Sequence, residues 1–328
     1  MADRALAWQA ARKTLEQLTK HVTNILAPSF YRFMSTQRPP TIDPQASARW
    51  SAQLPAQSPW LHEEVARRME ERLQWIVRNP ASWLHWSPLQ GGRKVHEQLV
   101  QRYPKAQGYV QQGSAAQVQL ARAHLQQAWW APARWLKSDP QFSMPTKQVD
   151  MLWANMALHM EADPQALIQQ WHAMLAVDGF LMFSCLGPDT LRELRRVYAD
   201  LGWPAPHHDF TDMHDWGDML VHAGFAEPIM DMERITLTYS SADSLLVDLR
   251  GLGRNLHIQR FPALRGKQWR GKLHEILESA LRGSDGRLQL TFEVVYGHAF
   301  KPQVKHSVMP KTLVSLEDMR RSLQKGKP

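Results

Sequence analysis

From residue 60 onward, the chain alternates between amphipathic helical patterns and short apolar runs. The helical segments repeat apolar residues every three or four positions, as Val65, Met69 and Leu73 show, whereas the short runs are apolar almost throughout. This alternation is typical of an α/β fold in which crossover helices join parallel strands. The predicted helices span residues 60–77, 92–102, 115–128, 163–176 and 189–201, and the predicted strands span residues 81–86, 107–111, 149–156 and 180–186.

The C-terminal third predicts the remainder of the same sheet. Residues 234–239 and 288–300 have the apolar patterns of strands, and residues 242–252 and 267–282 between them have helical patterns. A Ser-Asp-Gly turn at residues 284–286 leads into the last strand. We therefore predict five or more parallel strands that close with an antiparallel pair.

The segment before residue 60 has a different character. Residues 3–26 predict an amphipathic helix, which could lie on a membrane surface, on a partner or on its own domain; its modest charge favours the last. Five prolines between residues 35 and 59 predict a linker or surface strap without regular structure. The expected organisation is an N-terminal helix and linker over residues 1–59, one domain over 60–302 and a basic tail over 303–328.

Composition narrows the compartment and the partners. The chain has one cysteine, Cys185, no run of about 18 uncharged apolar residues and no secretory signal pattern, which together predict a cytoplasmic protein. Its net charge of +8 favours an acidic partner, either nucleic acid or an acidic carrier protein. The basic residues are scattered and no zinc-finger spacing accompanies them, so nucleic-acid binding is the less favoured interpretation.

Four blocks in the C-terminal half carry a family resemblance. They occupy residues 149–195, 210–225, 248–255 and 290–300, in this order and almost without gaps. Together they resemble the malonyl-carrier O-methyltransferases of biotin synthesis, which use S-adenosylmethionine. The resemblance implies a Rossmann-like class I methyltransferase sheet, mostly parallel with an antiparallel last strand, and an N-terminal helical extension. It also implies an acyl carrier protein or malonyl-CoA as the carrier of the substrate.

The cofactor loop departs from the pattern of that family. There, an acid ends the first strand and a glycine-rich turn lets the backbone approach the cofactor. By position, His85 stands where the acid belongs, Ser87 and Leu89 stand where glycines belong, and Pro88 lacks a backbone donor; Gly91 fits. The loop is therefore degenerate by this comparison.

Other expected acids are also replaced. Gln111 and Gln112 stand where an acid would bind the ribose hydroxyls, and amides form weaker hydrogen bonds than carboxylates. Neither residues 128–137 nor residues 49–59 supply the further acids that the resemblance implies. The residues predicted to bind the cofactor are His85, Gly91, Gln111 and Gln112.

The substrate site should grip a malonyl carboxylate with cations or hydrogen-bond donors, because the reaction requires positioning more than proton transfer. Three candidates have a structural alternative: Asn155 could be a strand-end turn residue, Arg254 a surface charge at a helix end, and His159 a turn cap. The predicted substrate-binding residues are Asn155, His159, His214, Arg250 and Arg254, with His257 as a further candidate by position.

Two other motifs invite chemical interpretations. His207, His208 and Asp209 are consecutive, His214 and Asp215 follow shortly after, and imidazoles with a carboxylate could hold zinc or iron. The resembling family uses no metal, so no metal site is predicted. Cys185 follows an apolar run and is interpreted as a buried core thiol.

Three functions remain open from the sequence. The resemblance favours O-methylation of a malonyl group on a carrier protein or coenzyme A. The degenerate loop favours a non-catalytic methyltransferase-fold protein that acts as a binding or scaffold module. A related respiratory-complex assembly factor that modifies a protein side chain is the third, and it fits the altered loop no better than the first.

Overall fold

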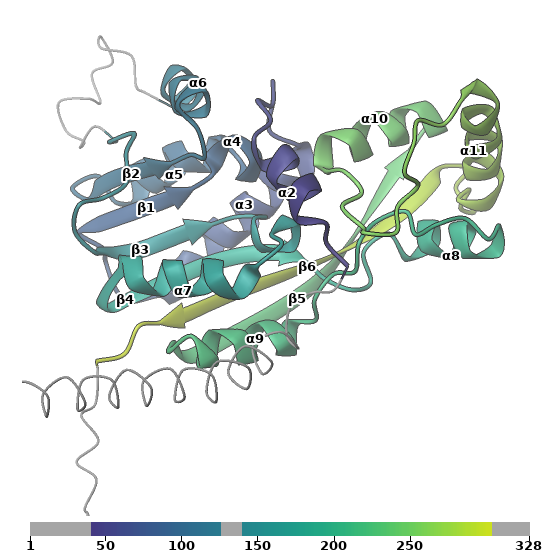
Figure 1. Ribbon diagram of the computed structural model, residues 1–328. Helices are drawn as coiled ribbons and strands as arrows, with labels where there is room; N and C mark the ends of the chain where they lie inside the picture. Colours follow the sequence, from purple (N-terminus) through teal and green to yellow (C-terminus); the bar gives the residue numbers. More distant parts are fainter. Residues whose placement is uncertain (1–40, 126–139, 304–328) are drawn as a thin grey trace, which may run out of the picture.

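The computed structural model describes residues 41–125 and 140–303 and contains one six-stranded sheet, ordered β2-β1-β3-β4-β6-β5 (Figure 1). Neighbouring strands from β2 to β4 pair in parallel, whereas β6 runs antiparallel to both β4 and β5. The predicted mostly parallel sheet with an antiparallel last strand is confirmed, but the prediction of five or more parallel strands is wrong, because the described sheet has four. The strands are β1 Ser82–Trp86, β2 Gln107–Gln111, β3 Val149–Ala154, β4 Leu175–Leu186, β5 Ala226–Tyr239 and β6 Leu288–Phe300.

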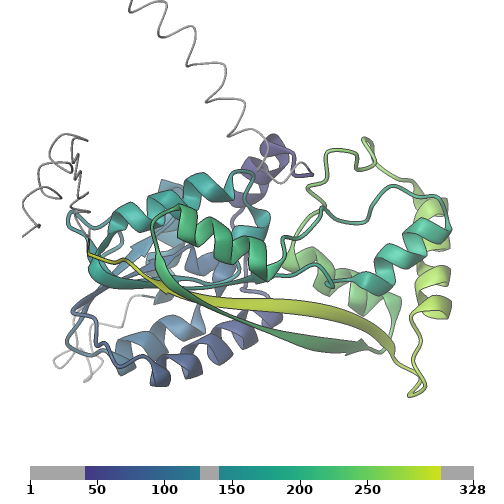
Figure 2. The same cartoon turned by 90° about the horizontal axis from the view of Figure 1, so that it is seen from below.

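Helices cover both faces of the sheet (Figure 2). In β3, Met151 and Trp153 pack among residues of α3 and α5, while Leu152 and Ala154 pack among residues of α7 and α9. This alternation is the period of two that buries both faces of a strand. The helices are α2 Pro44–Ser51, α3 Trp60–Arg72, α4 Pro88–Gly91, α5 Lys94–Arg102, α6 Ala115–Leu125, α7 Pro164–Met174, α8 Arg192–Asp200, α9 Met213–His222, α10 Ala242–Leu252 and α11 Lys267–Ala280, with short 3-10 turns η1 Leu73–Trp75 and η3 Leu158–Met160.

Strands β5 and β6 extend well beyond the parallel strands as a curved two-stranded ribbon (Figure 1). The end of the ribbon near Tyr239 and Leu288 carries α8, α10 and α11, and we call these three helices with that ribbon end the distal lobe. Leu245 of α10, Leu273 and Leu277 of α11 and apolar residues of the ribbon belong to the same core cluster. The lobe is therefore part of the main core.

The prediction that residues 35–59 lack regular structure is wrong for α2. Asp43 caps this helix by accepting hydrogen bonds from the backbone N–H groups of Gln45 and Ala46, and Pro44 occupies the first helical position. The same Asp-Pro signal begins α7 at Asp163. The five prolines of this segment favoured a prediction of irregular structure over the helix start at Asp43 and Pro44.

Long-range contacts hold α2 against the domain. Ile42 and Ala46 pack with Leu256, Ile42 pairs with His257 in an isolated antiparallel bridge, and Arg260 forms an ion pair with Asp43 at 2.7 Å. The predicted helix over residues 3–26 and the predicted tail beyond residue 303 lie outside the described residues. Within residues 41–125 and 140–303, no helix has the length and apolarity needed to cross a membrane.

Candidate functional site

A cavity of about 200 Å³ opens at the carboxyl ends of β1, β2 and β3, and we call it the strand-end cavity. Its walls include Trp86 at the end of β1, Ser87 after it, Gln111 at the end of β2, and Met156 after β3. In open α/β sheets, ligands bind outside the carboxyl ends of the strands. Of the predicted cofactor residues, Gln111 lies on this wall.

The loop after β1 places its two unexpected side chains differently. Ser87 lines the cavity and adopts a left-handed backbone conformation, with φ 49° and ψ 51°, which costs less for glycine than for serine. Leu89 is fully buried and packs with Val110 and Ala121, away from the residues that line the cavity. Of the two residues that stand at expected glycine positions, Ser87 therefore lines the cavity and Leu89 does not.

Gly91 serves packing at the back of this loop. A Cβ atom added there would lie 2.5 Å from the carbonyl oxygen of Asn155, so no larger residue fits without a shift of the backbone. Asn155 is buried, donates from Nδ2 to the carbonyl oxygens of Gly91 and His62, and accepts from Ser184 Oγ at 2.6 Å. Asn155 thus ties the loop to α3 and β4, and its amide is fully used within the protein.

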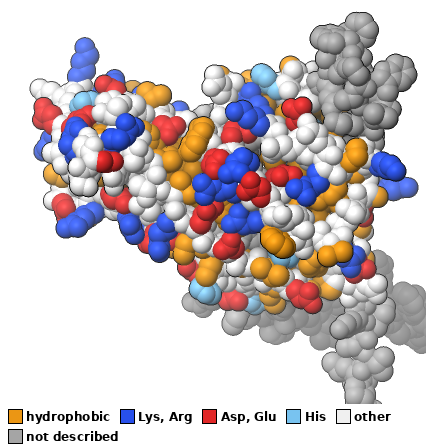
Figure 3. All heavy atoms as spheres, turned by 180° about the vertical axis from the view of Figure 1, so that it is seen from behind, with side chains coloured by type: hydrophobic (Ala, Val, Ile, Leu, Met, Phe, Trp, Pro, Cys, Tyr) orange, Lys and Arg blue, Asp and Glu red, His pale blue; other side chains and the backbone are white. Residues whose placement is uncertain are grey.

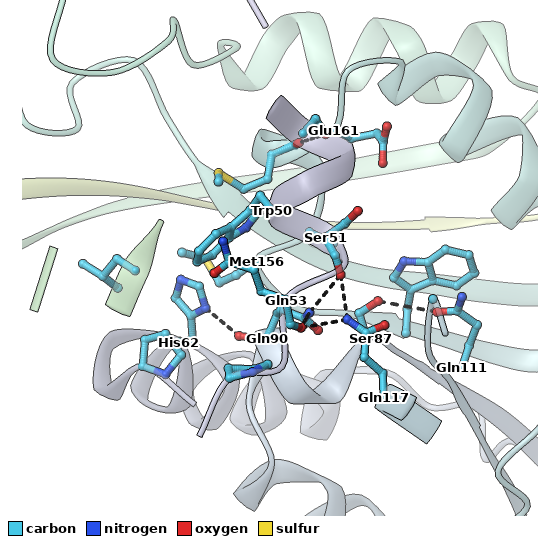
Figure 4. Close-up of a pocket in the computed structure, with 18 of the residues that line it drawn as sticks. Trp50, Ser51, Gln53, His62, Ser87, Gln90, Gln111, Gln117, Met156 and Glu161 are labelled. Atoms are coloured by element: carbon cyan, nitrogen blue, oxygen red, sulfur yellow. Dashed lines mark hydrogen bonds between the residues drawn. The ribbon is translucent and has the colours of Figure 1, made fainter. Parts of the chain in front are cut away.

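Helix α2 forms one wall of the strand-end cavity and is fastened there by two glutamines (Figure 4). Gln117 Nε2 lies 2.7 Å from the carbonyl oxygen of Ser51 and 2.9 Å from that of Gln53. Gln90 Nε2 approaches the same two oxygens at 3.3 and 3.4 Å. Because carbonyl oxygens only accept, both amides donate here, which assigns their orientation.

Several hydrogen-bond acceptors at this wall have no partner among the described residues. They are Oε1 of Gln90, Oε1 of Gln117 and Nε2 of His62. His62 Nδ1 lies 2.7 Å from the carbonyl oxygen of Gln90 and must donate to it, so Nε2 of the neutral ring is a bare acceptor. Burial lowers the pKa of His62 to about 4, which keeps this ring neutral.

Glu161 supplies the single carboxylate among the described residues that line the cavity, and no Lys or Arg of the described chain joins them. Burial raises the pKa of Glu161, and hydrogen bonds from the backbone N–H groups of Ala162 and Asp163 oppose that rise. This single carboxylate, without a neighbouring cation on the described wall, makes the cavity suited to a positively charged ligand. Sequence reasoning missed Glu161, although an acid on the loop after a parallel strand was a usable signal.

A second cavity of about 250 Å³ lies between the distal lobe and the ends of β4 and β6, and we call it the lobe cavity. Its wall is largely apolar, with residues such as Leu194, Leu249 and Phe292, but Arg250 and Arg254 also line it. The lobe cavity and the strand-end cavity share Met160 and Leu252 as lining residues, so the two adjoin. One cavity thus suits a cation and its neighbour suits an anion.

Three buried histidines line the lobe cavity: His159, His207 and His208. His208 Nε2 donates to the carbonyl oxygen of His159 at 2.7 Å, and His207 Nδ1 donates to that of His208 at 2.5 Å. Burial lowers the pKa of His207 to about 4 and lowers the pKa of His208 as well. Each ring is therefore neutral and keeps one nitrogen as a bare acceptor, without a partner among the described residues.

The structure brings together some of the predicted substrate residues. His159, Arg250 and Arg254 all line the lobe cavity. His214 is exposed at the start of α9, where Nδ1 lies 2.6 Å from Asp212 Oδ1, and it lines neither cavity. His257 is buried beside α2 and accepts a hydrogen bond from the backbone N–H of Gln259.

The remaining predicted cofactor residues lie off the cavity wall. His85 is buried between β1 and α5, with Nδ1 3.2 Å from Nδ1 of His96, and burial lowers its pKa well below the ordinary value. Gln112 follows Gln111, and its side-chain amide is buried without a partner among the described residues. Their predicted role in cofactor binding stays a prediction.

The other sequence motifs have structural settings. In the described part of the chain, no group of three or more His, Cys, Asp or Glu side chains is arranged to hold a metal ion. Cys185 is buried in β4, and burial raises the pKa of its thiol. Residues 128–137, which lack the third acid that the resemblance implies, lie outside the described residues.

Comparisons with known proteins agree with this geometry. Residues 90–183 match the family model described as a methyltransferase domain. The chain is 40% identical over 256 residues to the malonyl-[acyl-carrier protein] O-methyltransferase of Gallionella capsiferriformans, covering 74% of this chain and 84% of that protein. It is 38% identical over 254 residues to the enzyme of the same name from Laribacter hongkongensis, covering 75% and 84%.

Proposed function

Since this chain belongs to the malonyl-[acyl-carrier protein] O-methyltransferase family, we propose that it methylates the free carboxylate of a malonyl group held as a thioester on an acyl carrier protein, with S-adenosylmethionine as the methyl donor. The observation that carries the proposal is the pair of adjoining cavities with opposite electrostatic preference. The strand-end cavity is lined by one carboxylate and by no Lys or Arg of the described chain, and the lobe cavity is lined by two arginines.

The strand-end cavity fits the methyl donor by the chemistry of its wall. S-adenosylmethionine, when bound, supplies an electrophilic methyl group on a positively charged sulfur, together with ammonium, hydroxyl and amine donors. Glu161 would hold positive charge, and Gln90 Oε1, Gln117 Oε1 and the bare nitrogen of His62 would accept hydrogen bonds that the described protein leaves unmade. An unmade buried hydrogen bond costs about 1–3 kcal/mol, so a donor-rich ligand is favoured here.

The lobe cavity fits the substrate. Arg250 and Arg254 provide fixed positive charge for the malonyl carboxylate, since guanidinium groups match carboxylate geometry. The bare nitrogens of His207 and His208 accept hydrogen bonds and would repel a carboxylate, but they suit the amide N–H groups of a neutral carrier arm. The carboxylate therefore belongs near Arg254, and the arm belongs along the apolar wall.

The reaction requires the protein mainly to position the methyl donor and the carboxylate. A carboxylate oxygen forms a bond to the methyl carbon while the carbon–sulfur bond breaks, and the sulfur keeps the electron pair of that bond. No proton moves, so no general base is needed. Arg254 and Arg250 hold the carboxylate, Met160 and Leu252 form the shared wall, and α2 with Trp50 helps to exclude water from the donor side.

The product is a methyl ester without the terminal negative charge. It resembles an ordinary apolar acyl chain, so enzymes that elongate fatty acids could accept it. The biotin pathway requires an enzyme that masks the malonyl carboxylate as a methyl ester, and we propose that role for this chain.

The decisive test is methyl transfer with the purified full-length chain. Incubation with S-adenosylmethionine and malonyl-acyl carrier protein should add the mass of one methylene group to the carrier, and calorimetry should show micromolar binding of S-adenosylmethionine. A parallel reaction with malonyl-CoA as the substrate identifies the preferred carrier. Absence of both methylation and S-adenosylmethionine binding in a folded sample would instead support the non-catalytic alternative. Complementation of a bacterium that lacks its own malonyl methyltransferase then tests the pathway.

A further inference from the structure

One stretch of the distal lobe has an unusual charge balance. Between residues 249 and 274 the chain has seven basic residues and no Asp or Glu. The net charge of the whole chain is +8, so this stretch carries an excess nearly equal to that of the entire protein. The seven are Arg250, Arg254, Arg260, Arg265, Lys267, Arg270 and Lys272.

Most of these cations lack a carboxylate partner in the described part of the chain. Arg260 pairs with Asp43 at 2.7 Å and Arg270 pairs with Asp243 at 3.7 Å, while the other five form no ion pair among the described residues. Helix α3 shows the contrary arrangement, because Arg67, Arg68 and Arg72 pair with carboxylates of α3 and β5. Positive and negative side chains intermingle in this way on the face seen in Figure 3.

The same stretch also exposes large apolar side chains. Leu264 is 99% exposed, and Ile258 and Phe261 are about half exposed. Single exposed apolar residues are common, but three within seven positions, between unpaired cations, form a mixed surface. Arg265 packs on two rings of this surface, since its guanidinium lies 4.3 Å from the ring centroid of Phe261 and 4.1 Å from that of Trp269.

This surface is continuous in sequence with the wall of the lobe cavity. Arg250 and Arg254 line that cavity, and residues 258–272 follow directly along the chain. A partner that docks on residues 258–272 therefore contacts the segment that continues along the chain from the two arginines of the cavity that the proposed function assigns to the carrier arm. The surface chemistry calls for a partner with acidic and apolar side chains together, because opposite charges steer association and apolar contacts hold the complex.

We propose that residues 258–272 form the docking surface for the acyl carrier protein, with Lys267 and Lys272 meeting its carboxylates and Leu264 meeting an apolar side chain. The inference rests on the proposed function for the identity of the partner. It goes further by assigning where the partner binds and by separating recognition of the carrier from recognition of the malonyl group.

The test reverses charge at the surface and leaves the cavities intact. The full-length Lys267→Glu/Lys272→Glu protein is compared with Lys105→Glu/Lys147→Glu, whose exposed lysines precede β2 and β3 at the opposite end of the sheet. Steady-state kinetics use two substrates, malonyl-acyl carrier protein and malonyl-pantetheine. We expect KM for the carrier substrate to rise about tenfold or more in the first variant, with kcat and all malonyl-pantetheine constants unchanged. The second variant should behave as wild type.

A second pair of variants tests the apolar part of the same surface. Leu264→Asp should raise KM for the carrier substrate alone, whereas Val77→Asp, at a residue that is 95% exposed before β1, should not. Direct binding of fluorescently labelled acyl carrier protein to each variant gives a readout that does not depend on turnover.

The outcomes separate the two proposals. If wild type methylates neither substrate, the proposed function fails, and the binding measurement still decides the docking surface. If wild type methylates both but the lysine variant keeps wild-type KM and affinity for the carrier, the docking surface is wrong. An equal loss with both substrates also overturns it, because that result would place the lysines in the fold or in the cavity.

Discussion

The guanidinium of Arg254 lies 5.6 Å from the ring centroid of Trp50. Arg254 lines the lobe cavity and Trp50 lines the strand-end cavity, so this contact joins the two sites. Arg254 Nη1 also donates to the carbonyl oxygens of Arg250 and Gly253, which fixes the side chain against the end of α10. The guanidinium of Arg254 thus lies between the proposed binding sites of the methyl donor and of the substrate carboxylate.

Replacement of Arg254 by alanine should lower kcat/KM for the malonyl substrate about 10- to 100-fold, since a charged hydrogen bond contributes about 1.5–3 kcal/mol. Arg254→Lys should recover part of the activity, because lysine keeps the charge but loses the planar fork. Steady-state kinetics provide the measurement. Arg78→Ala is the control, because Arg78 pairs at 3.6 Å with Asp178 away from both cavities. Equal effects of the two alanine variants would contradict the assignment.

Glu161→Gln should weaken binding of S-adenosylmethionine about tenfold while the fold is kept, since the replacement removes charge without changing shape. Because burial raises the pKa of Glu161, the wild-type carboxylate loses its charge on acidification earlier than an ordinary glutamate. Wild-type affinity should therefore fall as the pH is lowered through that raised pKa, and the affinity of the variant should depend less on pH. Calorimetry across pH measures both, with the exposed Glu97→Gln as control. Unchanged affinity in Glu161→Gln would remove this residue from the site.

Leu89→Ala should destabilise the protein by about 2–5 kcal/mol without improving cofactor affinity, because Leu89 is buried against Val110 and Ala121. Ser87→Gly should be neutral or stabilising by up to about 1 kcal/mol, since glycine adopts the φ of +49° without the steric cost. Urea unfolding measures stability, and calorimetry measures affinity. Tighter cofactor binding in Leu89→Ala would show that this side chain obstructs the cavity after all.

Gln117→Glu should loosen the end of α2, because a carboxylate would face the carbonyl oxygens of Ser51 and Gln53 and could not donate to them. We expect faster proteolytic cleavage between residues 52 and 59 and weaker binding of S-adenosylmethionine. Gln119→Glu makes the same change at an exposed position of the same helix and should have neither effect. Identical cleavage rates in the two variants would mean that Gln117 does not fasten α2.

The buried histidines predict a loss of stability in mild acid. Burial lowers the pKa of His62, His96 and His207 to about 4, whereas an unfolded histidine has a pKa near 6.5. The unfolded chain therefore binds more protons between these values, so stability falls as the pH decreases from about 6.5 towards 4, on the order of 1–2 kcal/mol for each residue at pH 5. Thermal melts at pH 7, 6 and 5 should show the decrease. His96→Gln should reduce it and the exposed His124→Gln should not; a Tm independent of pH would refute the argument.

The pattern of apolar residues predicted much of the sheet because its signals are local. Strand β6 and helix α10 begin and end where the periodicity predicts. The start of β4 at Leu175 was missed, since residues 175–178 resemble a helix end and a turn, yet they continue the strand. Helix α9 and the first half of β5 were also not predicted, although α9 falls within a block that carries the family resemblance.

The candidate site was less predictable because it depends on contacts between distant segments. The strand-end position of Gln111 could be predicted from the sequence, since it follows from the order of strands alone. The roles of Gln90 and Gln117 depend on where the chain returns with Ser51, more than 35 residues away from either. No periodicity contains that information.

The extended β5–β6 ribbon separates the two cavities between two parts of the polypeptide. Most residues that line the strand-end cavity, the proposed donor site, precede Leu186, while most residues that line the lobe cavity, the proposed acceptor site, follow it in the sequence. Exchange of the segment between Leu186 and Leu288 for that of a relative could therefore redirect the protein to a different carboxylic acid while its donor chamber persists. The ribbon therefore allows the segment that carries the proposed acceptor site to be exchanged as a unit.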